Sequence, residues 1–402
     1  MSKKLNKQQH PASHAVTMKN HTMWIFLTIV FLIHFLVNFY IFIRGWQSLS
    51  LFPSVRPYFA AVFILLFLSY ILARILEKHI GFSVANIFNH IGSVWFAAML
   101  YFFLFILLFD LLRMFNHWLH FFPAIFMANY AKTKFITMLF TVGAVLLLIT
   151  YGFINANVVR VTTMDMPVKK YAGNLKSLNV VMLSDIHLGT IIGQKKLGAI
   201  INKVNELSPD IVLLAGDVVD ENVKHVIKQN LGANFENIKS KYGVYAVPGN
   251  HEFIGGADAA VAYLEKHKVH FLRDTALLID NSFWLAGRND KDMARFNGKS
   301  REPLETLLAP LDKNYPLILL DHQPFFLETS AKNGVDIQFS GHTHNGQIFP
   351  LNLITRAIYH PDWGYRKIGD THFYVSCGVG TWGPPVRIGN YPEIVNAKII
   401  FN

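Results

Sequence analysis

Four apolar stretches constrain the fold of this chain most, because each is long enough to cross a lipid bilayer as a helix. A helix needs about 20 residues to cross the ~30 Å hydrocarbon core of a membrane. The stretches are Met23–Ile43, Tyr58–Leu76, Ser93–Leu112 and Ile136–Ala156. Pro53 and Pro57 separate the first stretch from the second, where a helix should break. Residues 23–157 are therefore predicted to form a membrane domain of about four transmembrane helices.

The charge distribution predicts on which side of the membrane the rest of the chain lies. The formal net charge is +11, with basic residues in a tail at 1–22 and just after the last apolar stretch. Four crossings place both ends of the chain on one side, and the positive-inside rule makes that side the cytoplasm. We therefore predict a multi-pass protein of the inner (cytoplasmic) membrane. Nucleic-acid binding also explains a basic chain, but basic flanks beside anionic lipid headgroups explain it more simply.

The sequence changes character near Asn179, where short apolar runs begin to alternate with amphipathic stretches. Runs at 179–184, 210–215, 243–247, 317–320 and 335–339 predict buried strands, and 194–207, 223–240 and 257–268 predict helices. Segments 277–285 and 372–401 are typical of antiparallel strands. We predict an α/β or mixed α+β domain with a layered sheet core at 179–402, joined to the membrane domain by a linker at 158–178. The single cysteine, Cys377, excludes a disulfide within the chain.

Polar clusters follow directly after five of the predicted strands. In chain order they are Asp185-Ile-His187, Gly216-Asp217, Gly249-Asn250-His251-Glu252, Asp321-His322 and Gly341-His342-Thr343-His344. In open parallel sheets, ligands bind beyond the carboxyl ends of the strands. These strand ends should therefore bring the polar side chains together at one rim of the sheet.

The residue types in these clusters predict a site for two metal ions. Two aspartates, one asparagine and four histidines are candidate ligands: Asp185, His187, Asp217, Asn250, His322, His342 and His344. Oxygen and imidazole donors without thiolates suit Mn²⁺, Zn²⁺, Fe²⁺ or Co²⁺ better than Ca²⁺ or Mg²⁺ alone. Seven ligands exceed the need of one ion, whereas two ions that share a carboxylate leave open positions for water and substrate. Two metals about 3.5–4 Å apart promote in-line displacement at phosphorus.

The order of these motifs resembles that of the calcineurin-like metallophosphoesterases. The family pattern D-x-H, G-D-x-x-D, G-N-H-E, H and G-H-x-H is matched by 185–187, 216–220, 249–252, His322 and 341–344. The resemblance covers 179–402, and five separated motifs in order make it specific. The segment Gly378–Glu393 and the run 345–347 look like the membrane-associated bacterial branch of the family. The resemblance implies two facing mixed sheets flanked by helices.

The resemblance also implies a role for each residue. Asp185, His187 and His344 would hold one metal ion, and Asn250, His322 and His342 the other. Asp217 would bridge the two ions, and His251 would contact the phosphoryl oxygens or protonate the leaving group, so these two residues are the predicted catalytic pair. Mn²⁺ is the expected metal. Substrate contacts are expected from Asn250, His251 and Arg288, whereas Asp220, Glu252 and Asp321 are expected to position or cap their neighbours.

The membrane stretches and the motifs together predict a membrane-anchored hydrolase of a phosphodiester or pyrophosphate. A soluble substrate would not require anchoring, so we expect a lipid-linked one. Some members of the family hydrolyse UDP-2,3-diacylglucosamine, which the resemblance makes the leading substrate; other phospholipids, polyprenyl phosphates and nucleotides are alternatives. Phe253, Ile254, Trp363 and Tyr365 are predicted to admit acyl chains.

Two other classes of function are open to such a chain. A non-catalytic metal-binding membrane sensor would be favoured by the loss of a ligand, and none of the seven is missing. A nuclease would fit the basic charge, but four membrane stretches argue against it. We therefore expect no stable nucleic-acid partner.

Overall fold

The chain divides into two compact units, Met1–Leu147 and Leu148–Asn402. The structure is a computed structural model that describes residues 11–79 and 82–402. Lys3, Lys4 and Lys7 of the predicted basic tail lie outside the described residues, and the first helix begins at Pro11.

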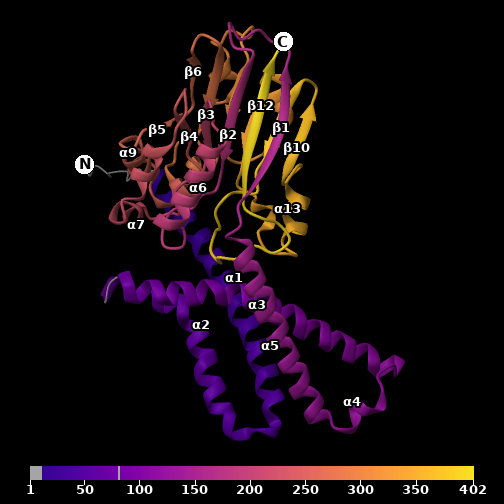
Figure 1. Ribbon diagram of the computed structural model, residues 1–402. Coiled ribbons are helices and arrows are strands. Elements are labelled where there is room, and N and C mark those ends of the chain that lie inside the picture. The colour runs from indigo at the N-terminus through magenta and orange to yellow at the C-terminus, as the bar shows by residue number, and fades with distance from the viewer. Residues whose placement is uncertain (1–10, 80–81) are drawn as a thin grey trace, which may run out of the picture. The chain divides into compact units, whose positions relative to one another are not determined.

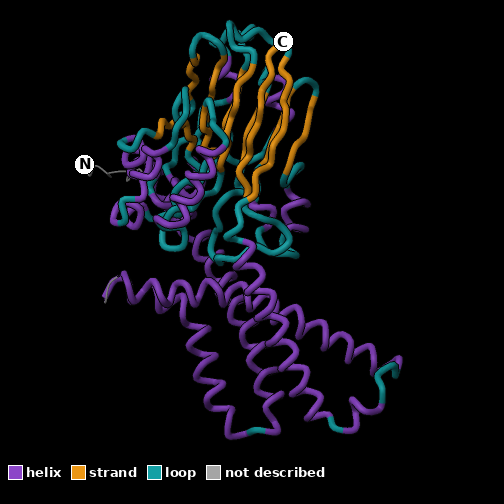
Figure 2. Tube along the Cα trace, viewed as in Figure 1, coloured by secondary structure: helices purple, strands orange, loops and turns teal. Residues whose placement is uncertain are grey.

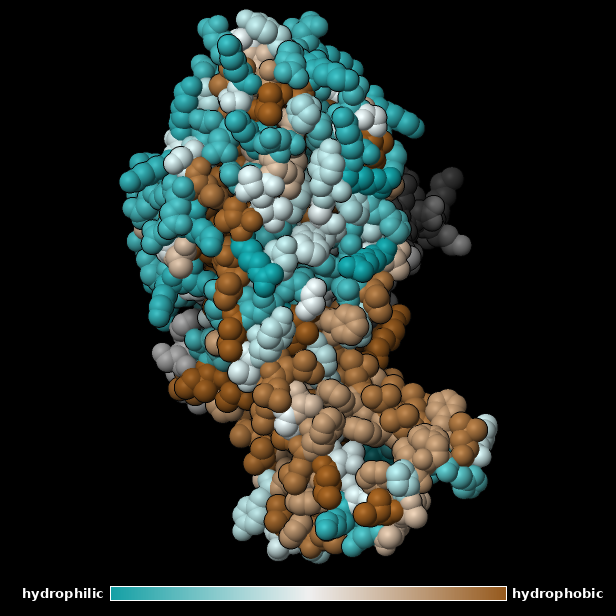
Figure 3. All heavy atoms as spheres, turned by 45° about the vertical axis from the view of Figure 1, so that its right-hand side comes forward, coloured by the Kyte–Doolittle hydropathy of each residue, from teal (hydrophilic) through white to brown (hydrophobic). Residues whose placement is uncertain are grey.

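The first unit is built from helices, the last of which continues into the second unit as residues 148–155 (Figures 1 and 2). They are α1 (Pro11–Ser48), α2 (Arg56–His79), α3 (Phe82–Leu119), the short α4 (Ala124–Ala128) and α5 (Tyr130–Asn155), with the 3-10 turns η1 (Leu49–Leu51) and η2 (Pro53–Val55) between α1 and α2. Helices α1, α2, α3 and α5 are each long and apolar enough to cross a membrane. Their surface is largely apolar on the face shown in Figure 3. The prediction of four apolar helices is therefore confirmed.

The break between α1 and α2 falls at the predicted prolines. Pro53 opens η2, and Pro57 lies in the first turn of α2. A proline is tolerated there because the first N–H groups of a helix need no intrahelical partner.

The second unit contains two six-stranded mixed sheets flanked by helices, as the family resemblance implies. The first sheet has the order β1-β12-β2-β3-β4-β5 and the second β10-β11-β9-β8-β7-β6. The strands are β1 (Arg160–Val168), β2 (Ser177–Leu183), β3 (Ile211–Ala215), β4 (Val244–Val247), β5 (Val269–Phe271), β6 (Thr275–Ile279), β7 (Phe283–Gly287), β8 (Leu317–Leu320), β9 (Ile337–Ser340), β10 (Gly364–Ile368), β11 (Thr371–Val375) and β12 (Glu393–Phe401). Strands β2 to β5 are parallel, as are β7, β8, β9 and β11.

Short helices connect these strands. They are α6 (Gln194–Glu206), α7 (Val223–Lys228), η3 (Leu231–Asn237), α8 (Asn250–Gly255), α9 (Ala257–Glu265), α10 (Met293–Phe296), α11 (Leu304–Leu308), α12 (Leu327–Lys332), η4 (His344–Gly346) and α13 (Asn352–Ile358). The helix predicted at 223–240 is interrupted, because Asn230 takes a left-handed conformation with φ of 49° between α7 and η3.

The apolar runs are buried on both faces, which explains why they show no alternation with polar residues. On β2, Val180 and Met182 belong to the core between the two sheets, together with Phe339 of the second sheet. Val181 and Leu183 of the same strand pack on the opposite face, in a core that includes the apolar side of α6. The central strands are therefore rigid supports for the loops that follow them.

The segment 158–178, which the sequence predicts as a linker, contains strand β1. This strand pairs in parallel with β12 from Arg160↔Glu393 to Val168↔Phe401, and the two run side by side in Figure 1. β1 is an edge strand of its sheet, where Pro167 is tolerated because one side of the strand needs no ladder partner. The fold of the second unit therefore begins before Asn179.

Glu393 ties the start of β12 to its surroundings. Its buried carboxylate accepts hydrogen bonds from Trp363 Nε1 and Cys377 N, both at 2.9 Å, and from Thr162 Oγ1 and Tyr374 O–H, both at 3.0 Å. Four donors satisfy a buried charge that would otherwise be costly. Strand β12 is thereby fixed to β1, to β11 and to the loop that begins at Cys377.

Candidate metal centre

The structure brings all seven predicted metal ligands together at the carboxyl ends of strands. Asp185 and His187 follow β2, Asp217 follows β3, and Asn250 opens α8 after β4 in the first sheet; His322 follows β8, and His342 and His344 follow β9 in the second. The strand ends thus come from two facing sheets. The expectation that they lie on the rim of a single sheet is therefore wrong. The second sheet supplies three of the four histidines.

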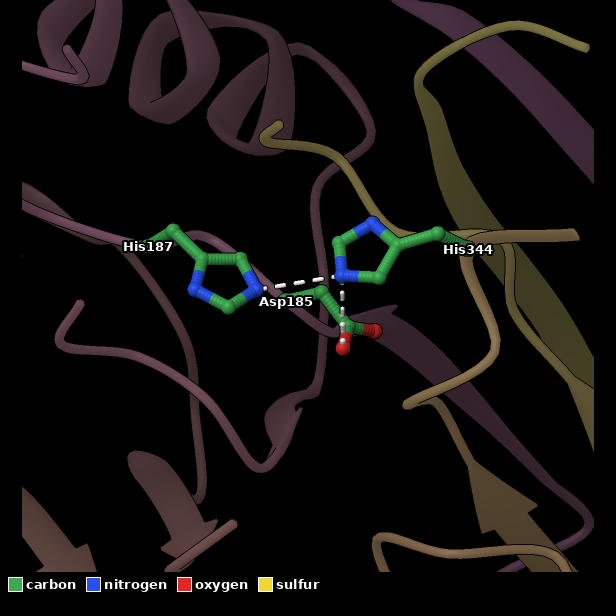
Figure 4. Close-up of side chains that lie close together, drawn as sticks. All are labelled: Asp185, His187 and His344. Carbon is green, nitrogen blue, oxygen red and sulfur yellow. Dashed lines mark hydrogen bonds and ion pairs between the residues drawn. The ribbon is translucent and has the colours of Figure 1, made fainter. Parts of the chain in front are cut away.

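The first group of donors contains Asp185, His187 and His344. His187 and His344 point toward one another from two different loops, and the Asp185 carboxylate lies beside the His344 ring (Figure 4). The two Nε2 atoms are 3.1 Å apart, and His344 Nε2 lies 3.5 Å from Asp185 Oδ1. Asp185 and His187 are at most 1% exposed. Two ring nitrogens and a carboxylate therefore converge on one buried point.

The second group contains Asp217, Asn250, His322 and His342. Asn250 Oδ1 lies 2.9 Å from His342 Nδ1 and 3.2 Å from His322 Nε2. Asp217 Oδ2 lies 3.0 Å from His322 Nε2 and 4.0 Å from His187 Nε2 of the first group. The Asp217 carboxylate is therefore placed between the two groups, where a bridging ligand is required.

Outer contacts select the nitrogen that His187 and His322 present to the centre. His322 Nδ1–H donates to the Ala215 carbonyl at 2.8 Å, which leaves Nε2 free to bind. His187 Nδ1 lies 3.5 Å from Asp220 Oδ1, so its Nε2 faces His344. Metal-binding histidines are commonly oriented in this way by a carbonyl or a carboxylate. The donor set fits two divalent cations of the Mn²⁺, Fe²⁺, Zn²⁺ or Co²⁺ class.

Five of the seven candidate ligands have a backbone conformation that is unusual for residues with side chains. Asp185, His187, Asp217, His342 and His344 have φ values between 49° and 75°. The left-handed region costs roughly 1–2 kcal/mol per residue. Such strain gathers at functional sites, where the surrounding fold enforces it.

The motif glycines are required by the close approach of these loops. A Cβ on Gly249 would lie 2.1 Å from Asp217 Oδ1, and one on Gly341 would lie 2.4 Å from Asp185 Oδ2. Any side chain at either position would displace a ligand carboxylate. The glycines of the G-N-H-E and G-H-x-H patterns therefore have a steric role.

Glu252 joins the loops that follow β3 and β4. Its carboxylate accepts from Gly249 N at 2.7 Å, Val219 N at 2.8 Å and Asp217 N at 3.1 Å. The side chain is fully buried. This agrees with the capping role expected from the sequence and makes Glu252 a support for Asp217.

Burial and neighbouring charges set the protonation of the centre. Burial lowers the pKa of His342 to about 3 and the pKa of His344 well below its usual value, which keeps both rings in the neutral form that binds metal. Burial alone would also lower the pKa of His322, but the charge of Asp217 raises it well above the usual value. Burial raises the pKa of Asp185.

His251 lies beside the two groups rather than within either of them. Its backbone N–H donates to Asp217 Oδ1 at 2.8 Å, and its Nδ1 lies 3.3 Å from Asp220 Oδ1. Burial would lower the pKa of His251, but Asp217 and Asp220 outweigh burial and raise that pKa to about 9. The His251 ring is 5.7 Å from the ring of Trp382, which is 55% exposed. The exposed Trp382 marks the side on which the centre meets solvent.

Arg288 is held in a buried ion-pair cluster. Its Nη1 donates to Asp321 Oδ2 at 2.9 Å and its Nη2 to the Glu302 carbonyl at 3.0 Å, while Arg301 Nη1 donates to Asp321 Oδ1 at 2.8 Å. Asp321 thus orients its neighbourhood, as expected for the residue that precedes His322. Substrate contact by Arg288 stays a prediction.

The predicted acyl-chain residues do not share one surface. Phe253 is 2% exposed, so the prediction that it admits acyl chains is wrong. Trp363 donates its Nε1–H to Glu393, and the exposed Tyr365 contacts His372 Nδ1 at 2.9 Å. Ile254 is 42% exposed. The exposed Trp382 lies beside His251, although it was not predicted as a site residue.

Two positioning residues, Arg387 and Asn390, were also missed. Arg387 is fully buried and donates to the carbonyls of Cys377 at 2.7 Å and Gly378 at 3.0 Å. Asn390 Nδ2 donates to the carbonyl of the ligand His344 at 2.8 Å. Both lie in the segment 378–393, which the sequence marked only by its family resemblance.

The same loop joins the end of α5 to the centre within the second unit. Asn155 Nδ2 donates to the carbonyls of Arg387 at 3.0 Å and Asn390 at 2.7 Å, and Arg387 N donates to the Gly152 carbonyl at 2.9 Å. A Cβ on Gly152 would lie 2.7 Å from Ile388 Cγ1. The final turn of α5 is therefore packed directly against the loop that supports His344.

Comparisons with known proteins agree with this geometry. Residues 178–346 match the family model described as calcineurin-like phosphoesterase. The chain is 31% identical over 224 residues to an uncharacterized metallophosphoesterase of Aquifex aeolicus, which covers 55% of this chain and 85% of the relative. It is 29% identical over 379 residues to one of Campylobacter jejuni, which covers 92% of this chain and 97% of the relative.

The name of one animal relative describes it as a transmembrane protein. The chain is 32% identical over 262 residues to a transmembrane protein with metallophosphoesterase domain of Danio rerio, which covers 62% of this chain. The chain spans 59% of the length of that protein and 60% of the length of an uncharacterized metallophosphoesterase of Helicobacter pylori.

Proposed function

Because the chain belongs to the calcineurin-like phosphoesterases, a family of metal-dependent phosphoesterases, we propose that it is a membrane-anchored hydrolase of a phosphodiester or pyrophosphate bond. The observation that carries this proposal is the convergence of all seven predicted ligands into two groups that adjoin at Asp217. The four apolar helices and the transmembrane relatives support a membrane location.

The ligands divide between two divalent cations. Asp185, His187 and His344 would hold one cation, Asn250, His322 and His342 the other, and Asp217 would be shared. Bound there, two such cations would supply Lewis-acid polarisation of the phosphoryl group and a source of hydroxide as the nucleophile at neutral pH. We propose Mn²⁺ as the metal, with Zn²⁺, Fe²⁺ and Co²⁺ as alternatives that accept the same donors.

His251 is placed to act on the leaving group. Its backbone is fixed by Asp217 Oδ1, and Asp220 holds its Nδ1. The remaining nitrogen, Nε2, is then free to donate a proton to the departing oxygen or a hydrogen bond to a phosphoryl oxygen. Trp382, at the edge of the His251 ring, offers an apolar surface to the part of the substrate beyond the phosphate.

We propose a lipid-linked substrate such as UDP-2,3-diacylglucosamine, and the four apolar helices support this choice. Purified full-length chain in detergent with Mn²⁺ should release UMP from this lipid with a kcat/KM more than about tenfold above that for UDP-glucose, because burial of two methylene groups already contributes ~1.6 kcal/mol. Phosphatidylglycerol and a polyprenyl diphosphate are the comparison lipids.

The outcomes of this comparison separate the substrate from the chemistry. Equal kcat/KM for the acylated and non-acylated substrates would refute the lipid-linked substrate and leave the hydrolase in place. Absence of turnover on every substrate, including bis(p-nitrophenyl) phosphate, would refute hydrolysis itself and favour a metal-binding sensor.

We propose that the catalytic domain faces the cytoplasm from the inner membrane. Inverted membrane vesicles from cells that make the chain should hydrolyse bis(p-nitrophenyl) phosphate added outside them, because this anion does not cross the bilayer. Right-side-out vesicles should do so only after detergent is added. The reverse pattern would place the domain on the other side of the membrane.

A further inference from the structure

The helices of the first unit line a partly open cavity of about 860 Å³. Its lining comes from α1, α2, α3, α4 and α5, all within residues 41–142. Ligand pockets in proteins usually hold about 300–1,000 Å³, so the cavity is large enough for a substantial part of an amphiphilic molecule.

The polar lining of the cavity forms one connected cluster. Asp110 is paired with Arg44 at 2.6 Å and with Arg113 at 3.4 Å. Arg113 Nη1 also donates to the Tyr130 hydroxyl at 2.8 Å, and the Lys134 ammonium lies 5.1 Å from the centre of the Tyr130 ring. All five side chains line the cavity. The charged groups are therefore gathered together rather than spread over its wall.

This cluster carries an excess of positive charge. Arg44, Arg113 and Lys134 provide three cations, and Asp110 is the one acidic residue within the four candidate membrane spans. The net charge of the cluster is thus about +2 at neutral pH. An excess of positive charge beside a largely apolar wall favours the binding of an anion.

The rest of the lining is mainly aliphatic and aromatic. Phe59 and Phe63 of α2 and Phe102, Ile106 and Phe109 of α3 contribute to it. A water-soluble anion would leave this apolar wall without contacts. An acyl chain would cover it, and a phosphate group on the same molecule would neutralise the cations.

We propose that this cavity binds an anionic phospholipid, with its phosphate at Arg44, Arg113 and Lys134 and an acyl chain along the walls from α2 and α3. Each cation near a lipid phosphate adds about 1 kcal/mol, which is roughly a fivefold change in affinity. The site lies in the helical unit and is separate from the metal centre, so the proposal does not depend on hydrolysis.

The test is native mass spectrometry of the full-length chain titrated with phosphatidylglycerol or with phosphatidylcholine of the same acyl chains. Phosphatidylglycerol should bind at least about fivefold more tightly. Lys134→Ala should weaken its binding about fivefold, and Thr137→Phe, which fills the lining without changing charge, should weaken both lipids. Lys132→Ala is the matched control, because Lys132 lies on the same helix, is exposed and is not part of the lining.

Two results would overturn the proposal. One is equal binding of the two lipids to the unaltered chain. The other is equal loss of phosphatidylglycerol in the Lys132→Ala and Lys134→Ala variants, which would indicate general attraction to a basic surface. Thermal unfolding followed by tryptophan fluorescence identifies a variant that has lost its fold, and in that case Lys134→Gln, which removes the charge but keeps most of the side chain, replaces Lys134→Ala.

Discussion

Replacing Asp217 with asparagine should reduce the hydrolysis of bis(p-nitrophenyl) phosphate by more than about 10³-fold. The Asp217 carboxylate lies 3.0 Å from His322 Nε2 and 4.0 Å from His187 Nε2, so it is the one ligand placed to serve both cations. Asparagine keeps the shape of the side chain but removes the negative charge that holds two positive ions together. The measurement is kcat/KM with saturating Mn²⁺, together with the number of metal ions per chain after dialysis.

The metal count is expected to fall from two per chain to one or none. Asp165→Asn is the matched control, because Asp165 is exposed on the edge strand β1 and remote in the fold from the strand ends that carry the ligands. That variant should keep its metal content and its activity. If Asp217→Asn retained both ions and full activity, the bridging role would be wrong.

His251→Ala is expected to lower kcat by roughly 10²–10⁴-fold, the usual contribution of a positioned acid. The two metal ions should remain, because His251 lies outside both donor groups that contain the seven ligands. The loss should be larger for a diester with a phenol leaving group than for one with p-nitrophenol, since the poorer leaving group has more need of a proton. The measurements are the hydrolysis rates of the two esters and the metal content of the variant. Both are needed to assign the acid role to His251.

An alternative role for His251 follows from its position. His187, Asp220 and His251 could also hold a metal ion among the described residues. If His251 were a ligand, its loss would remove metal and slow both esters equally, which contradicts an acid role. His270→Ala, at an exposed position on β5, is the control that should change neither the rate nor the metal content.

The candidate site was predictable from the sequence because its residues follow buried strands. An apolar run such as that of β3 can be read as a buried strand without knowledge of its partners, and the polar residue directly after it must then lie at a strand end. The pattern of apolar runs by itself did not indicate that the ends belong to two sheets, which only the family resemblance implied. That division depends on which strands pair, and pairing is decided by contacts between residues far apart in the chain.

Other parts of the fold had no local signal. Strand β1 is an edge strand with half-exposed residues, so its pattern resembled that of a linker, and its partner β12 lies more than two hundred residues away. Arg387 and Asn390 lie in an irregular loop without periodicity. Their positioning role can be recognised only from the backbone carbonyls to which they donate hydrogen bonds. The role of a buried polar residue in a loop depends on the groups that it contacts, and the residue composition of the loop does not reveal those contacts.

The position of β12 has a consequence for the order of events in the cell. A chain is synthesised from its N-terminus, so α1 to α5 are made first and β12 after every other strand of the two sheets. Yet β12 lies inside the first sheet, between β1 and β2. Glu393, the first residue of β12, donates its backbone N–H to the carbonyl of Gly378, which lies next to Asp185. The helices can therefore reach the membrane while the protein is still being translated, but metal loading of the finished centre has to wait until translation has passed β12.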